Sequence, residues 1–204
     1  MLRISLLSLP LLALPLLAAC GEDDDHGHGH EQEVITTVTL TFTPPGGGAP
    51  IVAEFDDPDG DGGAPPTVDA ITLEAGTTYA VTVGFENRLE APAEDITLEI
   101  RDEAEDHQVF FTGTAVDGPA SAQPAAPLAH TYVDTDADGL PLGLANQIVA
   151  SAGTGQLTLT LRHLPAVNGV ATKTADLATQ VREHGFAAIG GETDAQVTFD
   201  VTVQ

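Results

Sequence analysis

Apolar residues alternate with threonine and other polar residues in several short stretches, and this alternation is the strongest constraint on the fold. In the first stretch Val34, Val38, Leu40 and Phe42 share one face with Thr36. The same period of two recurs clearly over residues 79–85, 157–161 and 197–203, and more weakly over 51–55, 71–73, 109–112 and 130–133. Successive side chains of a β-strand point to opposite faces, so each stretch is predicted to be a half-buried strand. We therefore expect an all-β fold, an antiparallel β-sandwich of the immunoglobulin-like kind.

Two stretches predict short helices in the connections between strands. Pro92 and the acidic residues after it are typical of a helix start, which predicts a helix over residues 93–106. Apolar residues at alternate positions from Ile96 make a strand the competing interpretation. A second helix is predicted over residues 174–183, ended by Gly185.

The N-terminus predicts export. Residues 1–19 carry one early positive charge and then an apolar run that is too short for a spanning helix, so they are interpreted as a signal peptide. The end of this run, Leu17 to Cys20, resembles the lipobox of bacterial lipoproteins, in which the signal is removed and the cysteine is acylated. An ordinary secretory signal with an incidental cysteine is the competing interpretation. The resemblance implies lipidation at Cys20, and Gly21 in the next position implies the outer membrane.

The rest of the chain is expected to have two parts. Residues 20–33 are acidic, rich in histidine and without an apolar run, which predicts a flexible tether behind the lipid. Residues 34–204 hold the predicted strands and form the β-sandwich domain. Whether the protein faces the cell surface or the periplasm is left open by these features.

The chain is strongly acidic, with 31 Asp and Glu against 6 Lys and Arg and a formal net charge of -25. Such a charge repels phosphate backbones, so we expect no nucleic-acid partner, and cations are the natural small ligands. Ser5, Ser8, Ser121 and Ser151 are the four serines, and none lies in a G-x-S-x-G elbow. The protein is therefore predicted not to be an enzyme.

The first candidate metal ligands are the three histidines of the tether, His26, His28 and His30, which alternate with glycine. Neutral imidazoles suit zinc and copper, and glycine hinges let the rings converge on one ion. Ordering such a segment costs entropy, so weak, exchangeable binding is expected. A spacer that merely changes charge with pH is the competing interpretation.

A second candidate set lies in the predicted domain. If residues 93–106 are helical, Glu99, Glu103 and His107 are four residues apart and share one helix face, where they could ligate zinc or copper. His163 continues the apolar face of residues 157–161, at the inner edge of a strand. An exposed acidic helix face and a hydrogen-bonded core histidine are the competing interpretations.

Two loops of the form D-x-D-x-D-G are candidate calcium sites, because carboxylates converge on a hard cation in such loops. Neither has the bidentate acid that an EF-hand places at its twelfth position, where Val68 and Ala145 stand instead. Solvated Asp-Gly turns are the competing interpretation. The six candidate ligands are Asp57, Asp59, Asp61, Asp134, Asp136 and Asp138.

The segments AEDITLEIRDEAEDHQVFF, YVDTDADGLPLGLAN, LTLRH and GGETDAQVTFDVTVQ make the C-terminal two thirds resemble a family of small uncharacterised bacterial envelope lipoproteins. The resemblance implies an envelope address and no particular activity. The leading hypothesis is a lipid-anchored envelope protein that binds zinc or copper, as a scavenger or as an accessory to an outer-membrane metal transporter. The alternative is a structural or adhesion module, stiffened by calcium.

Overall fold

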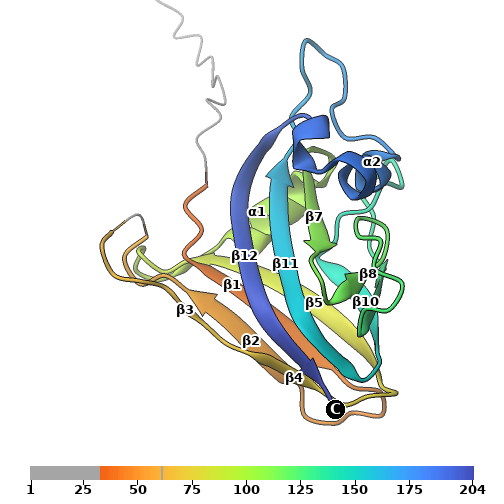
Figure 1. The fold of residues 1–204 in the computed structure, drawn as a ribbon. Helices are drawn as coiled ribbons and strands as arrows, with labels where there is room; N and C mark the ends of the chain where they lie inside the picture. Colours follow the sequence, from red (N-terminus) through yellow and green to blue (C-terminus); the bar gives the residue numbers. More distant parts are fainter. Residues whose placement is uncertain (1–32, 61) are drawn as a thin grey trace, which may run out of the picture. The chain divides into compact units, whose positions relative to one another are not determined.

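The computed structural model describes residues 33–60 and 62–204, in which two β-sheets share one hydrophobic core (Figure 1). The larger sheet has the order β3 (Thr67–Val68), β2 (Ile51–Asp56), β1 (Thr37–Thr43), β5 (Thr78–Asn87), β10 (Ala145–Ala150), β9 (Leu128–Tyr132), β8 (Val116–Asp117), and β6 (Glu94–Asp95) pairs with β5. The smaller sheet has the order β4 (Ile71–Leu73), β12 (Glu192–Val203), β11 (Gly153–His163), β7 (His107–Thr112). The expectation of a mostly β fold is confirmed in this form.

All eight stretches with a period of two contain strands, so that part of the sequence interpretation is confirmed. The alternation did not predict β3, β6, β8 or β10, three of which are only two residues long. Most pairs are antiparallel, as expected, but β4 runs parallel to β12 and β8 runs parallel to β9. These two short strands lie at sheet edges.

The core lies between the inner faces of the two sheets. Leu40 and Phe42 of β1 are fully buried there, together with Leu159 of β11 and Phe199 of β12. A smaller apolar cluster lies on the outer face of the smaller sheet, where Phe110 of β7 packs with residues of α2 (Leu177–His184). Strand β7 is therefore buried on both faces, which explains why its alternation is weak and why Val109, Phe110 and Phe111 are all apolar.

Both predicted helices exist, and each begins three residues later than predicted. Helix α1 spans Ile96–Asp102 and is followed by a 3-10 turn, η1 (Ala104–Asp106). Asp95 caps α1 by accepting a hydrogen bond from the Thr97 backbone N–H. The second helix, α2, leads into the 3-10 turn η2 (Phe186–Ala188). No helix in the described part of the chain is long and apolar enough to cross a membrane.

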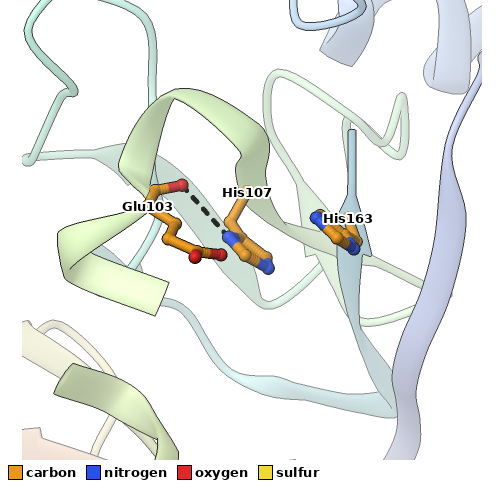
Figure 2. A group of neighbouring side chains, drawn as sticks. All are labelled: Glu103, His107 and His163. Atoms are coloured by element: carbon orange, nitrogen blue, oxygen red, sulfur yellow. Dashed lines mark hydrogen bonds between the residues drawn. The ribbon is translucent and has the colours of Figure 1, made fainter. Parts of the chain in front are cut away.

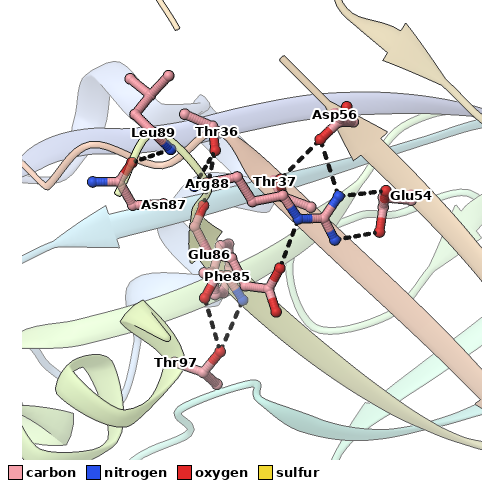
Figure 3. Close-up of polar contacts among 10 residues, drawn as sticks. All are labelled: Thr36, Thr37, Glu54, Asp56, Phe85, Glu86, Asn87, Arg88, Leu89 and Thr97. Atoms are coloured by element: carbon pink, nitrogen blue, oxygen red, sulfur yellow. Dashed lines mark hydrogen bonds and ion pairs between the residues drawn. The ribbon is translucent and has the colours of Figure 1, made fainter. Parts of the chain in front are cut away.

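Helix α1 is attached to β5 by one threonine side chain. The Thr97 hydroxyl accepts a hydrogen bond from the Phe85 backbone N–H at 2.8 Å and donates one to the Phe85 carbonyl at 3.2 Å (Figure 3). These two backbone groups would otherwise lack a strand partner on that side of β5. The contact fixes α1, and with it Glu99 and Glu103, relative to the larger sheet.

The segment before β1 is held at the same end of β5. The buried Thr36 hydroxyl accepts from the Arg88 backbone N–H at 2.8 Å and donates to the Glu86 carbonyl at 3.3 Å (Figure 3). The Arg88 guanidinium donates hydrogen bonds to the carboxylates of Glu54, Asp56 and Glu86. The bonds to Glu54 and Glu86 raise the pKa of Arg88. Because these side chains are partly exposed, each ion pair contributes only about 0.2–1 kcal/mol. The network fixes where the chain enters the domain, three residues after Glu33.

Candidate metal centre

Two histidines meet at one end of the smaller sheet. His107 is the first residue of β7 and His163 is the last residue of β11, and the two are paired across the antiparallel strands. Their rings stack with centroids 4.6 Å apart and an interplanar angle of 7° (Figure 2). Both imidazoles are therefore placed by strand register, which is a rigid support for a ligand pair.

This arrangement corrects the predicted helix face. Helix α1 ends at Asp102, Glu103 is its C-cap, and the chain is extended again from His107 onward. The spacing of four therefore does not carry His107 onto the helix. The physical reason is the run Val109 to Phe111, whose burial on both faces of the sheet favours a strand over a longer helix. His163 approaches His107 within one sheet, from the neighbouring strand.

The hydrogen bond of the His107 ring to Glu103 determines its tautomer. Nδ1 lies 3.1 Å from the Glu103 backbone carbonyl, and because a carbonyl can only accept, Nδ1 must carry the proton (Figure 2). Burial lowers the pKa of His107 below 6.5, so the ring is neutral at pH 7. Nε2 then holds a free lone pair, and it is buried without a hydrogen-bond partner. A backbone carbonyl on one ring nitrogen and a bare second nitrogen is the usual state of a metal-binding histidine.

Glu103 supplies a carboxylate to the same place. One carboxylate oxygen of Glu103 and one ring nitrogen from each of His107 and His163 lie within 4.8 Å of one another. Glu103 is exposed, whereas His107 is only 1% exposed, so the group opens to solvent on the carboxylate side. Two imidazoles and one carboxylate are a ligand set that zinc and copper accept.

A group of three carboxylates adjoins the group formed by Glu103, His107 and His163. Oxygens of Glu33, Glu99 and Glu103 also lie within 4.8 Å of one another. Burial, together with the charges of Glu99, Asp194 and other acids, raises the pKa of Glu33 from 4.5 to about 7. The Glu33 Oε1 atom is 3.9 Å from His107 Nε2, and Oε2 is buried without a hydrogen-bond partner. Glu33 was assigned to the tether in the sequence interpretation and was not recognised as a site residue.

Asp194 was also missed, and a strand irregularity explains why. Leu161 pairs with Ala195 and Arg162 pairs with Thr193, so Asp194 is an extra residue in β12. Burial raises the pKa of Asp194 to about 6, although the charges of His163 and Arg162 act against this rise. Its Oδ2 atom is buried without a hydrogen-bond partner. Bulges of this kind re-aim side chains and are frequent beside functional sites.

Among the described residues, Arg162 forms no ion pair with the carboxylates of this acidic cluster, which belong to Glu33, Glu99, Glu103 and Asp194. Arg162 donates to the Thr193 hydroxyl and to the carbonyls of Gly190 and Gly191, at 2.5–2.7 Å. Its Coulombic effect reaches Asp194, but the raised pKa of that group shows that burial prevails. The cluster thus combines buried lone pairs with an excess of negative charge, which a cation would relieve.

The second Asp loop is organised by the protein itself. Both oxygens of Asp134 accept backbone N–H groups at 2.8–2.9 Å, from Gly143, Leu144 and Ala145. Asp136 accepts from the Leu140 N–H and forms a buried ion pair with Lys173 at 2.7 Å. These contacts favour the turn interpretation for this loop. Asp138 is exposed beside them.

The first Asp loop is described only in part, because Asp61 is outside the described residues. Asp59 accepts a hydrogen bond from the Ala64 N–H, and one buried oxygen of Asp57 lacks a partner. The predicted ligands His26, His28 and His30 and the predicted lipidation site Cys20 are also outside the described residues. Those expectations stay predictions.

No family model, no curated protein and no solved structure matches the chain.

Proposed function

We propose that this is a lipid-anchored protein of the outer membrane that binds a divalent transition metal, zinc or copper, as a scavenger or as an accessory to a metal transporter. The observation that most supports metal binding is the state of His107. Its imidazole is buried and neutral, its Nδ1 donates a hydrogen bond to a carbonyl, and its Nε2 has no hydrogen-bond partner. His163 and Glu103 are the partners within reach. Cys20 is the proposed anchor.

A bound ion requires a small contraction of the group. In a tetrahedral zinc site with bonds of about 2.0–2.1 Å, ligand atoms are roughly 3.3 Å apart. The three ligand atoms here lie within 4.8 Å of one another, so side-chain rotations of Glu103 and His163 suffice. Both are more exposed than His107. A water molecule would occupy the fourth position.

The tether histidines would form a second, weaker site. His26, His28 and His30 alternate with glycine in a polar segment, so we expect metal binding to supply the energy that orders them. In this proposal the tether collects ions at low affinity and the folded centre retains them. Zinc titrations with and without the three histidines separate the two contributions.

The test is a thermal melt of the full chain in which His26, His28 and His30 are all replaced by alanine. At zinc 100 times the dissociation constant, binding to the folded state stabilises it by about 2.7 kcal/mol. That corresponds to a rise of roughly 5–11 °C for a domain of this size. His163→Gln should abolish the rise, and His184→Gln, at an exposed histidine of α2, should retain it. If zinc and copper both leave the melt of the parent unchanged, the folded centre is not a metal site.

The alternative is a non-catalytic structural or adhesion module, an immunoglobulin-like antiparallel sandwich stiffened by calcium. The ordered loop around Asp134 and Asp136 supports the structural part of this alternative and not its calcium, because backbone N–H groups and Lys173 already bind these carboxylates. The same melt decides between the two. A rise in millimolar calcium over chelator, with no response to zinc or copper, supports the structural module.

A further inference from the structure

The two candidate ligand groups share one residue. Glu103 belongs to the group with His107 and His163 and also to the group with Glu33 and Glu99. A carboxylate has two oxygens, so Glu103 can offer one to each group. Resting on the proposed function, we propose that the centre holds two ions bridged by Glu103, a transition metal at the histidines and an oxygen-preferring divalent cation at Glu33 and Glu99.

The two ligand groups favour different metals, because one contains imidazoles and the other contains only carboxylates. Imidazole nitrogens suit zinc and copper, whereas a set made only of carboxylates suits manganese, magnesium or calcium. Paired ions in proteins lie about 3.5–4 Å apart, a span that one bridging carboxylate covers. The overlap of the two groups within 4.8 Å is compatible with that separation.

Buried atoms without partners indicate a ligand between the two groups. His107 is 1% exposed and its unpartnered Nε2 faces the Glu33 Oε1 atom at 3.9 Å, too far for a hydrogen bond. The Glu33 Oε2 atom is likewise buried and unpartnered. An acidic cluster on the surface would hydrate these atoms, but here they are withdrawn from water.

The charge balance favours two ions over one. Five carboxylates act on this place, and a single divalent ion leaves most of their charge uncompensated; they belong to Glu33, Glu94, Glu99, Glu103 and Asp194. A second divalent ion would compensate part of this charge and join Glu33 to the Glu103 bridge.

The experiment uses the full chain with His26, His28 and His30 replaced by alanine, loaded with one equivalent of zinc. Manganese is then titrated, and bound ion is counted from the loss of the free Mn²⁺ electron paramagnetic resonance signal. We expect one manganese per chain. Glu33→Gln should weaken manganese binding at least tenfold and leave zinc binding within about threefold. Glu103→Gln should weaken both, and His163→Gln should weaken zinc more than manganese.

The matched control is Glu74→Gln, at an exposed acid beside β4, away from the β7 and β12 ends that carry His107 and Asp194. Glu74→Gln should bind both metals as the parent does. It controls for the nonspecific attraction of cations to an acidic chain, because it removes one carboxylate outside the centre. Equal manganese binding in the parent and in Glu33→Gln overturns the two-ion centre. If zinc still binds in that case, the proposed function stands alone; if zinc does not bind the parent, the proposed function fails first.

Discussion

The buried ion pair between Asp136 and Lys173 makes a strong prediction. Both side chains are 1% exposed, their charged atoms are 2.7 Å apart, and Lys173 also donates a hydrogen bond to the Ala104 carbonyl at 2.7 Å. Burial opposes ionisation of Asp136, but Lys173 and the Leu140 N–H hold its pKa below the usual 3.8. We expect Lys173→Met to leave Asp136 as an isolated buried carboxyl that must either stay charged or take up a proton.

The cost follows from the cheaper of these two options. Protonating a carboxyl of ordinary pKa 3.8 costs about 4.4 kcal/mol at pH 7 and about 1.6 kcal/mol at pH 5. The lost hydrogen bond to Ala104 adds about 1 kcal/mol at either pH. The variant should therefore lose about 5 kcal/mol at pH 7, near the range for broken buried pairs, and about 3 kcal/mol at pH 5. Because the folded variant binds a proton that the unfolded chain has released, the loss grows as the pH rises.

Urea unfolding at pH 5 and pH 7 measures this difference. Lys173→Met combined with Asp136→Asn is the control, because asparagine keeps the Oδ1 acceptor for Leu140 and has no charge. The control should lose stability equally at both pH values. A Lys173→Met variant that loses less than about 1 kcal/mol, or the same amount at pH 5 and pH 7, would show that the pair is not isolated from water as described.

Two further predictions concern other groups. Burial lowers the pKa of His130 from 6.5 to about 4, although its hydrogen bond with Asn146 acts in the opposite direction. As the pH falls, the unfolded chain therefore binds a proton at this histidine before the folded chain does. The free energy of unfolding should decrease by about 3 kcal/mol between pH 6.5 and pH 4. Urea unfolding at pH 7 and pH 4 measures the free energy of unfolding at each pH. His130→Leu should lose about 3 kcal/mol less than the parent between pH 7 and pH 4, and an equal loss in variant and parent would contradict the assignment. Cys20→Ala should block acylation and release or mislocalise the protein, measured by lipid labelling and membrane fractionation; unchanged labelling and fractionation would refute the lipidation site.

The sequence predicted the strands well because their signal is local. Leu157, Leu159 and Leu161 alternate with polar residues along β11. This pattern can be recognised without knowing which strands pair with β11. Helix α1 was recognised from its start, but its end was not, because burial of Val109 and Phe111 decides where the chain becomes extended again. Tertiary contacts overrode the spacing of four that had placed His107 on the helix.

The candidate centre was predicted only in part, since its geometry depends on pairing between distant segments. Glu99, Glu103, His107 and His163 were recognised by residue type, but the register of β7 with β11 is what brings the histidines together. The bulge at Asp194 has no signature in a single sequence, because the period of two from Val197 carries back through Ala195 and assigns Asp194 to the outer side. Glu33 was missed because its contact with His107 is not local.

The division of the centre into an exposed acidic rim and a buried imidazole has a consequence for the kinetics of ion capture. Glu94, Glu99 and Glu103 are exposed, so their field extends into solvent and accelerates the arrival of cations. This field is screened over about 30 Å at 0.01 M salt and about 8 Å at 0.15 M, so capture slows as salt increases. In the proposed centre, departure would depend on the bond between the ion and His107, which is withdrawn from solvent and therefore screened much less. We therefore expect salt concentration to change how fast an ion enters the proposed centre far more than how long it stays.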